Sequence, residues 1–180
     1  KGSPVVGCNS VPNLRLHPLE TRTVEATIPI TNCRRWTPEA PHLYQVLSRT
    51  KSDQLETRFG MREFRFNPQT QIGELNGQPY FLRGSNVCFF RFEEDPNRGN
   101  KPWDESWVRT LHQRFKSLHM NTLRYCIGFP PELWYRIADE EGLIIQDEFP
   151  VWTLSEDDQT PVTVDRLASE YRDWMRAHWN

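Results

Sequence analysis

The sequence has few cysteines and no long apolar run, and both absences narrow the class of protein. Four cysteines are scattered over 180 residues without a Cys-x-x-Cys pair, which argues against a zinc site and a dense disulfide framework. We expect buried thiols and leave open one bridge, such as Cys8 to Cys33, so cysteine content does not fix the compartment. No apolar stretch approaches the roughly 20 residues of a membrane span, and 37% hydrophobic residues are typical of a globular protein.

An excess of charge of one sign is also missing. The formal net charge is −2, which gives no electrostatic basis for binding nucleic acid or an anionic membrane. The motifs H-E-x-x-H, G-x-G-x-x-G and G-x-S-x-G are absent, and the five scattered histidines are expected to be structural or solvent-facing. We therefore expect no nucleic-acid partner, no membrane partner and no cofactor.

The first ten residues, KGSPVVGCNS, contain no apolar region of a signal peptide and no evident start. We expect the chain to begin inside a longer protein. Its localisation stays open, with a periplasmic or secreted protein among the possibilities.

Residues 1–65 have the patterning of a β-domain. Apolar and polar residues alternate over residues 23–30, which predicts a half-buried antiparallel strand. Further strands are expected at residues 43–49 and 57–66, the second interrupted at Gly60. So few short strands cannot close a sandwich, and residues 1–65 are interpreted as the C-terminal part of a β-sandwich domain.

The pattern changes after a turn at residues 67–70. Asn76-Gly77 predicts a two-residue hairpin, and from residue 80 strands and helices alternate. The expected elements are strands at residues 80–87, 121–125 and 143–146 and helices at residues 104–119, 130–142 and 163–179. The last strand is a continuous apolar run, which is typical of a strand buried in a parallel sheet.

The apolar stripes of the three helices are expected to face the sheet. They consist of Trp107, Val108, Leu111, Phe115 and Leu118, then Leu133, Trp134, Ile137 and Ala138, and then Leu167, Tyr171, Trp174 and Met175. A parallel β/α barrel needs eight such units and about 250 residues. Residues 66–180 are therefore expected to be the incomplete N-terminal part of a barrel, with three β/α units.

Polar residues stand where the three strands end, and the C-terminal ends of barrel strands build active sites. Asn86 both donates and accepts hydrogen bonds, which suits hydroxyl recognition. Arg124 and Glu148 lie on adjacent strands, where a direct ion pair would hold Glu148 ionised. There are two alternatives. Asp147 and Glu148 are acids of a solvated loop, and Arg124 forms a salt bridge at the rim.

Seven Trp and ten Phe are many for this length. Core packing explains most aromatics, whereas rings at strand ends can stack on sugars. The Phe-rich residues 88–92 and Trp152 are candidate walls of a sugar subsite, with core packing as the alternative. Residues 88–103 form a long loop of the kind that is often functional.

Short motifs occur in the order and spacing of one known family. They are Trp36-Thr37-Pro38-Glu39, Pro41-His42-Leu43-Tyr44, Phe59-Gly60-Met61-Arg62, Leu75-Asn76-Gly77-Gln78-Pro79, Leu82-Arg83-Gly84-Ser85-Asn86, Met120-Asn121-Thr122-Leu123-Arg124, Asp139-Glu140-Glu141-Gly142-Leu143 and Asp147-Glu148. Together they resemble glycoside hydrolase family 2, which contains β-galactosidases, β-glucuronidases and β-mannosidases.

The resemblance implies an immunoglobulin-like sandwich segment over residues 1–65 and the first three units of a TIM-barrel catalytic domain over 66–180. It implies a retaining exo-β-glycosidase, β-galactosidase-like, with two carboxyl groups about 5–5.5 Å apart. On this alignment both catalytic glutamates lie beyond Asn180, so no catalytic residue is expected in this chain. The expected substrate-binding residues are Asn86, Arg124, Asp147, Glu148 and Trp152, with carbohydrate as partner and the oligomeric state open.

Two departures from the family pattern bear on substrate and metal. Many members have R-x-S-H-Y-P after the second strand, whereas residues 124–130 lack the His and contain one extra residue. Galactose specificity of the usual kind is therefore in question. The E-x-H metal pair is replaced by Glu148-Phe149-Pro150, so no metal is expected. A non-catalytic carbohydrate-binding or structural module, or a stand-alone domain with another role, are the alternative functions.

Overall fold

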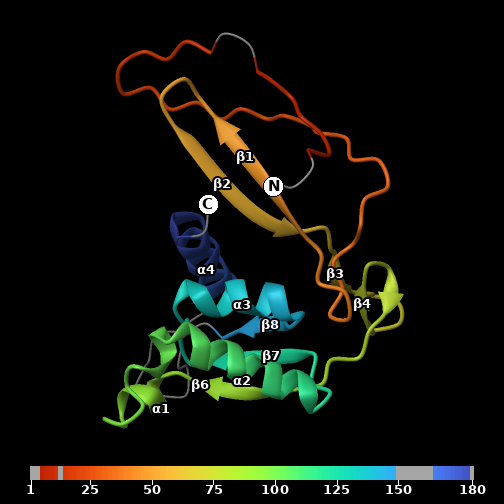
Figure 1. Cartoon of the computed structure of the whole chain (residues 1–180), viewed down its shortest axis with the longest axis vertical. Helices are drawn as coiled ribbons and strands as arrows, with labels where there is room; N and C mark the ends of the chain where they lie inside the picture. The colour runs from red at the N-terminus through yellow and green to blue at the C-terminus, as the bar shows by residue number, and fades with distance from the viewer. Residues whose placement is uncertain (1–4, 12–13, 149–163, 179–180) are drawn as a thin grey trace.

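A computed structural model describes residues 5–11, 14–148 and 164–178. The described strands form three sheets, in the orders β1–β2, β3–β4–β5 and β6–β7–β8. The β1–β2 hairpin lies at one end of the molecule, and the β6–β8 sheet with its helices at the other (Figure 1). Among the described helices, none has both the length and the apolar character needed to cross a membrane.

The first sheet is an antiparallel hairpin. β1 (Leu43–Arg49) pairs with β2 (Gln54–Gly60) along its whole length. The turn is closed by the Thr50 N–H, which donates to the Asp53 carbonyl at 2.8 Å. Two expected strands are confirmed here. The second ends at Gly60, where the interruption was predicted, and residues 64–66 form a separate strand.

The expected strand at residues 23–30 is wrong, because residues 14–35 contain no strand and are mostly exposed. Alternation of apolar and polar residues becomes a strand only where a neighbouring backbone takes its hydrogen bonds and a core covers its apolar face. In place of a backbone partner, Nδ2 of the Asn9 side chain donates to the Thr27 carbonyl at 2.9 Å. The described part of this region is a two-stranded sheet, so a sandwich is not established.

The second sheet contains β3 (Phe64–Phe66), β4 (Gly73–Leu75) and β5 (Gln78–Pro79). The predicted hairpin turn is confirmed: Asn76 and Gly77 have φ values of 54° and 78°, both in the left-handed region that a two-residue turn of this kind needs. The domain boundary expected between residues 65 and 66 falls inside β3 and stays a prediction.

The third sheet is parallel, with β6 (Gly84–Cys88), β7 (Thr122–Cys126) and β8 (Ile144–Asp147) in that order. β6 starts four residues later than expected, because the Asn121 side chain forms hydrogen bonds with the backbone that precedes it. Its Oδ1 accepts from the Arg83 N–H at 2.8 Å and its Nδ2 donates to the Phe81 carbonyl at 2.9 Å.

The crossover helices are α2 (Glu105–Ser117) and α3 (Glu132–Glu141). Asp104 caps α2 by accepting the Trp107 N–H at 3.0 Å, and Gly142 ends α3 with φ of 78°. Leu118 lies past the last turn of α2 and is 66% exposed, so its expected inward position is wrong. Outside the helix, its side chain no longer follows the apolar stripe.

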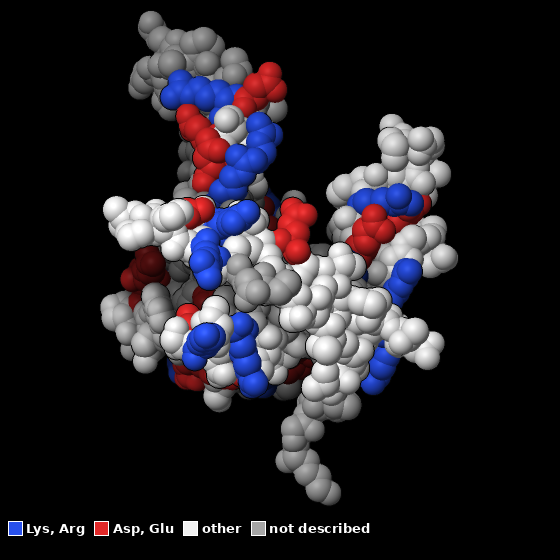
Figure 2. Space-filling view, turned by 90° about the horizontal axis from the view of Figure 1, so that it is seen from above, with Lys and Arg blue, Asp and Glu red and all other residues white. Residues whose placement is uncertain are grey.

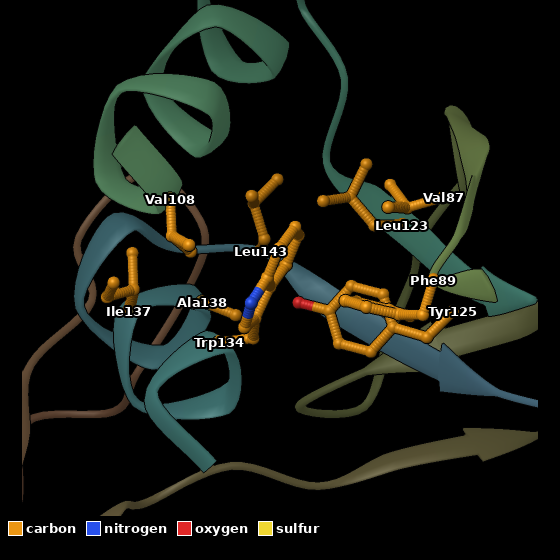
Figure 3. Close-up of a cluster of buried hydrophobic side chains, with 9 residues drawn as sticks. All are labelled: Val87, Phe89, Val108, Leu123, Tyr125, Trp134, Ile137, Ala138 and Leu143. Carbon is orange, nitrogen blue, oxygen red and sulfur yellow. The ribbon is translucent and has the colours of Figure 1, made fainter. Parts of the chain in front are cut away.

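Trp134 of α3 lies at the centre of the main core (Figure 3). It is fully buried, packs edge-on against Phe89 and Tyr125, and donates from Nε1 to the Pro102 carbonyl at 2.8 Å. The other core residues are Val87, Val108, Leu123, Ile137, Ala138 and Leu143. The inward faces of α2 and α3 are thus mostly confirmed. Phe89 packs in this core, which confirms core packing for this residue over the alternative of a sugar-subsite wall.

Two shorter helical segments and a last helix complete the chain. α1 (Phe90–Glu93) and a 3-10 turn (Lys101–Trp103) lie in the long loop, and α4 (Val164–His178) follows β8. β8 was expected to be fully buried but is only partly so, since it is the outer strand of the three-stranded sheet. Of the expected inward face of α4, Tyr171 is partly buried, and the side chains of Leu167, Trp174 and Met175 lie outside the described residues.

A group of contacts around Trp36, which we call the joint, connects the N-terminal region to the end of α3. Trp36 is completely buried and donates from Nε1 to the Asp139 carbonyl at 2.8 Å. The Arg62 guanidinium lies 4.4 Å from the Trp36 ring centroid and pairs with the Asp139 carboxylate at 2.8 Å. The Lys116 ammonium donates to the Pro38 carbonyl at 2.6 Å, so both sides of the joint are held by charged and polar groups.

Candidate functional site

The two faces of the β6–β8 sheet carry different side chains. Val87, Leu123 and Tyr125 are buried in the core beneath α2 and α3. Successive residues of a strand point to opposite faces, so Asn86, Arg124 and Cys126 lie on the face away from that core. The register pairs Asn86 with Arg124, which brings polar side chains together at the C-terminal ends of neighbouring strands.

Arg124 and Glu148 form the predicted ion pair. Nη2 of Arg124 lies 2.9 Å from Oε2 of Glu148, and Nη1 of Arg124 donates to Oδ1 of Asn86 at 3.4 Å. The Ile127 N–H also donates to Oε2 of Glu148, at 3.0 Å. Three of the expected site residues are therefore neighbours in space.

The loop after β7 adopts a strained conformation at this point. Ile127 has φ of 53°, which is an outlier for a β-branched residue and costs roughly 1–3 kcal/mol. This conformation directs the Ile127 N–H at Glu148, so the backbone strain accompanies a contact within the candidate site.

Several donors stabilise the ionised form of Glu148. The Cys126 thiol contributes most to lowering the pKa of this carboxyl below its ordinary value, followed by the Ile127 N–H and the charge of Arg124. Donation to Glu148, and then burial and the neighbouring Cys88, raise the pKa of Cys126 to about 11. Glu148 is thus a fixed carboxylate at neutral pH, and Cys126 is a neutral thiol.

The expectation of buried thiols is confirmed for Cys126 and wrong for the others, because Cys88 is partly exposed and Cys8 and Cys33 are exposed and unbridged. The place of Cys88 and Cys126 in this cluster was not predicted. The signal available in the sequence was the alternation of side chains between the two faces of a strand. Cys88 stands two residues after Asn86, and Cys126 stands two residues after Arg124, which puts all four on one face.

Asp147 lies apart from the other expected site residues. Its Oδ1 accepts from the Tyr135 hydroxyl at 2.9 Å, and Tyr135 belongs to α3 on the helix side of the sheet. Burial raises the pKa of Asp147, and burial followed by the charge of Asp147 raises the pKa of Tyr171. Trp152 lies outside the described residues.

Within the part of the chain that the structure describes, no group of three or more His, Cys, Asp or Glu is arranged to hold a metal ion. On the face shown in Figure 2, acidic and basic side chains alternate in small groups. This arrangement agrees with the net charge of −2.

Comparison with known proteins relates this geometry to one family. Residues 5–62 match the family described as Glycosyl hydrolases family 2. The chain is 32% identical over 157 residues to β-galactosidase 2 of Enterobacter cloacae, covering 83% of this chain and 14% of that protein. A β-galacturonidase structure from Eisenbergiella tayi, bound to galacturonate, superposes with a TM-score of 0.66 at 25% identity over 85% of this chain and 26% of that one. The chain belongs to glycoside hydrolase family 2.

A second solved relative is β-glucuronidase 3 of Bacteroides uniformis, with a TM-score of 0.55, 29% identity and coverage of 67% of this chain and 15% of that chain. This glycoside hydrolase family 2 chain spans about one seventh of the length of its curated relative from Enterobacter cloacae. The relatives with these names act on different sugars, so membership of the family does not by itself specify the sugar.

The family-like motifs serve two different structural purposes in this glycoside hydrolase family 2 chain. Those near residues 36, 62 and 76 converge on the buried Trp36, whose carbonyl also accepts from Asn76 Nδ2 at 3.0 Å. Those ending at Asn86, Arg124 and Glu148 converge on the candidate site. One set forms the joint between regions, and the other places polar groups at the sheet edge.

Proposed function

We propose that the protein to which these residues belong is a retaining exo-β-glycosidase, β-galactosidase-like, that hydrolyses terminal O-glycosidic bonds. Residues 1–65 would belong to an immunoglobulin-like sandwich and residues 66–180 to the start of a TIM barrel. The observation that carries the proposal is the Arg124–Glu148 pair beside Asn86, at the C-terminal edge of three parallel strands in a family 2 chain.

These residues are suited to binding a sugar and not to the acid/base step. A general acid needs a proton near neutral pH, whereas three donors hold Glu148 ionised. Asp147 has a raised pKa but contacts Tyr135 on the helix side. We infer that the acid/base and nucleophile come from parts of the protein outside residues 1–180.

The charge balance of the cluster favours a neutral sugar. Arg124 is neutralised by Glu148 at 2.9 Å, so the pair offers no net positive charge to a uronate carboxylate. Glu148 and the Asn86 amide offer acceptors and donors that match sugar hydroxyls. On this ground we place the substrate among neutral β-glycosides, with β-galactosides among them, in preference to β-glucuronides or β-galacturonides.

The test is a panel of aryl β-glycosides offered to the full-length protein. We expect release of the aglycone from a neutral β-glycoside, and Glu148→Gln is expected to lower kcat/KM by about tenfold or more, because the amide cannot replace an ionised acceptor. Glu94→Gln, on an exposed carboxylate paired with Arg91, is the matched control. Glycan binding without release of any aglycone would instead favour a non-catalytic carbohydrate-binding module.

A further inference from the structure

Two thiols face each other across neighbouring strands beside Glu148. Cys88 ends β6 and Cys126 ends β7, and the parallel register makes them direct partners. Neither is bridged, and their side chains are close enough to interact by hydrogen bonding. The pair therefore belongs to the candidate site face and not to the core under α2 and α3.

The spacing of the pair suits a disulfide. Neighbouring strands lie about 4.8 Å apart, and disulfide-bonded residues have Cα atoms about 4.4–6.8 Å apart. The two residues already lie in register and on one face, so bridging them requires rotation of side chains and only small movement of the backbone.

The surroundings give the two sulfurs different access. Cys88 is partly exposed, whereas Cys126 is buried. Cys126 donates its thiol proton to Glu148, and Arg124 Nη1 lies 3.8 Å from its Sγ. A proton acceptor and a positive charge thus flank the inner sulfur, while the outer sulfur is open to a small reagent.

We propose that Cys88 and Cys126 form a reversible disulfide when the protein meets a hydroperoxide. Cys88 sulfur attacks the peroxide oxygen, which gives a sulfenic acid and one water from hydrogen peroxide. Cys126 then attacks the Cys88 sulfur, its proton passes by way of Glu148 to the departing hydroxide, and a second water leaves. Two thiols and one hydrogen peroxide thereby become one disulfide and two waters.

Bridging removes a donor from Glu148. The disulfide sulfur of Cys126 carries no proton, so Glu148 keeps the Ile127 N–H and Arg124 but loses its thiol partner. A bridge that includes the partly exposed Cys88 is expected to be readily reduced, because exposed disulfides are the labile ones. The consequence for turnover rests on the proposed glycosidase function, whereas formation of the disulfide does not.

The decisive experiment maps disulfides in the full-length protein. Reduced protein is treated with hydrogen peroxide, remaining thiols are alkylated, and unreduced peptides are identified by mass spectrometry. We expect a peptide pair linked through Cys88 and Cys126 that disappears after dithiothreitol. In a protein that turns over aryl β-glycosides, kcat/KM should fall by about tenfold on oxidation and recover on reduction.

Variants separate this pair from the other cysteines. The double variant Cys8→Ser/Cys33→Ser removes two exposed thiols and should leave the link unchanged. Cys88→Ser should leave Cys126 alkylatable after peroxide, and Cys88→Ala serves if the serine variant is poorly folded. Peroxide that oxidises Cys8 and Cys33 while Cys88 and Cys126 both remain free thiols would overturn the proposal. A protein without glycosidase activity that still forms the link would overturn the proposed function and leave this inference standing.

Discussion

The hydrogen bond between Tyr125 and His112 gives the sharpest test of the core behind the site. His112 is fully buried, and its Nδ1 lies 2.8 Å from the Val108 carbonyl, so Nδ1 carries the proton. Nε2 is then an acceptor and receives the Tyr125 hydroxyl at 3.1 Å. Tyr125→Phe keeps the ring but leaves a buried acceptor without its donor.

The expected cost follows from that lost donor. An unsatisfied buried acceptor costs about 1–3 kcal/mol, and a central value of about 2 kcal/mol corresponds to an opening equilibrium constant about 30-fold larger, and so to about 30-fold faster hydrogen exchange. Hydrogen exchange of peptides from α2 and β7 in the full-length protein measures this directly. Tyr80→Phe is the control, because its hydroxyl reaches Glu39 Oε1 only at 3.4 Å in an exposed position.

The pair can be isolated by a double-mutant cycle. In a His112→Phe background, Tyr125→Phe should not accelerate exchange and should slow it, because it removes a buried hydroxyl that has already lost its acceptor. Equal exchange rates in wild type and Tyr125→Phe, or the same acceleration in both backgrounds, would refute the assigned hydrogen bond.

The same histidine predicts a pH dependence. Burial is the main cause that lowers the pKa of His112 below its ordinary 6.5. The unfolded chain therefore binds a proton below about pH 6.5 while the folded chain does not, so stability should fall as pH decreases through that range. His112→Phe should remove this slope from exchange rates corrected for intrinsic chemistry, and an unchanged slope would contradict the assignment.

Three further predictions concern the joint and the site. Gly142→Ala should lower the thermal stability of the protein more than Gly77→Ala does, although both glycines have φ of 78°. At position 142 a Cβ would lie 2.3 Å from the Pro38 carbonyl oxygen, whereas at position 77 it would meet nothing, so equal losses of melting temperature would contradict this contact. Arg124→Lys should reduce kcat/KM by about tenfold, since one ammonium cannot hold Glu148 and Asn86 together; full activity would exclude a fork-like role. The stability of Asp147→Asn relative to wild type should increase as pH rises above 3.8, because burial raises the pKa of Asp147 and disfavours its charged form. A decrease in that relative stability over the same range would show that the charge is stabilising.

The β/α alternation of residues 84–147 was predictable because its signals are local. Asp104 and Gly142 mark helix ends, and Asn76-Gly77 demands left-handed backbone at both positions. Parallel strands with helices between them also place their C-terminal ends at one edge, so the Arg124–Glu148 pair followed from order along the chain.

Other features depended on partners that the local sequence does not reveal. Residues 23–30 alternate like a strand but find no neighbouring strand, and Asn121 replaces strand pairing with side-chain hydrogen bonds before β6. His112 lies on the apolar stripe of α2, four residues after Val108, but its partner could not be predicted, because Tyr125 belongs to another element.

The candidate site shows the same division. The sequence by itself determined which residue types stand at the strand ends and that Arg124 and Glu148 would be neighbours, because strand order and period-two alternation are local properties. Only the tertiary structure decided that Asp147 lies beside Tyr135 on the helix side and that Cys126 contacts Glu148 on one side and Cys88 on the other. These placements depend on strand register and on helix packing, which join residues distant in the chain.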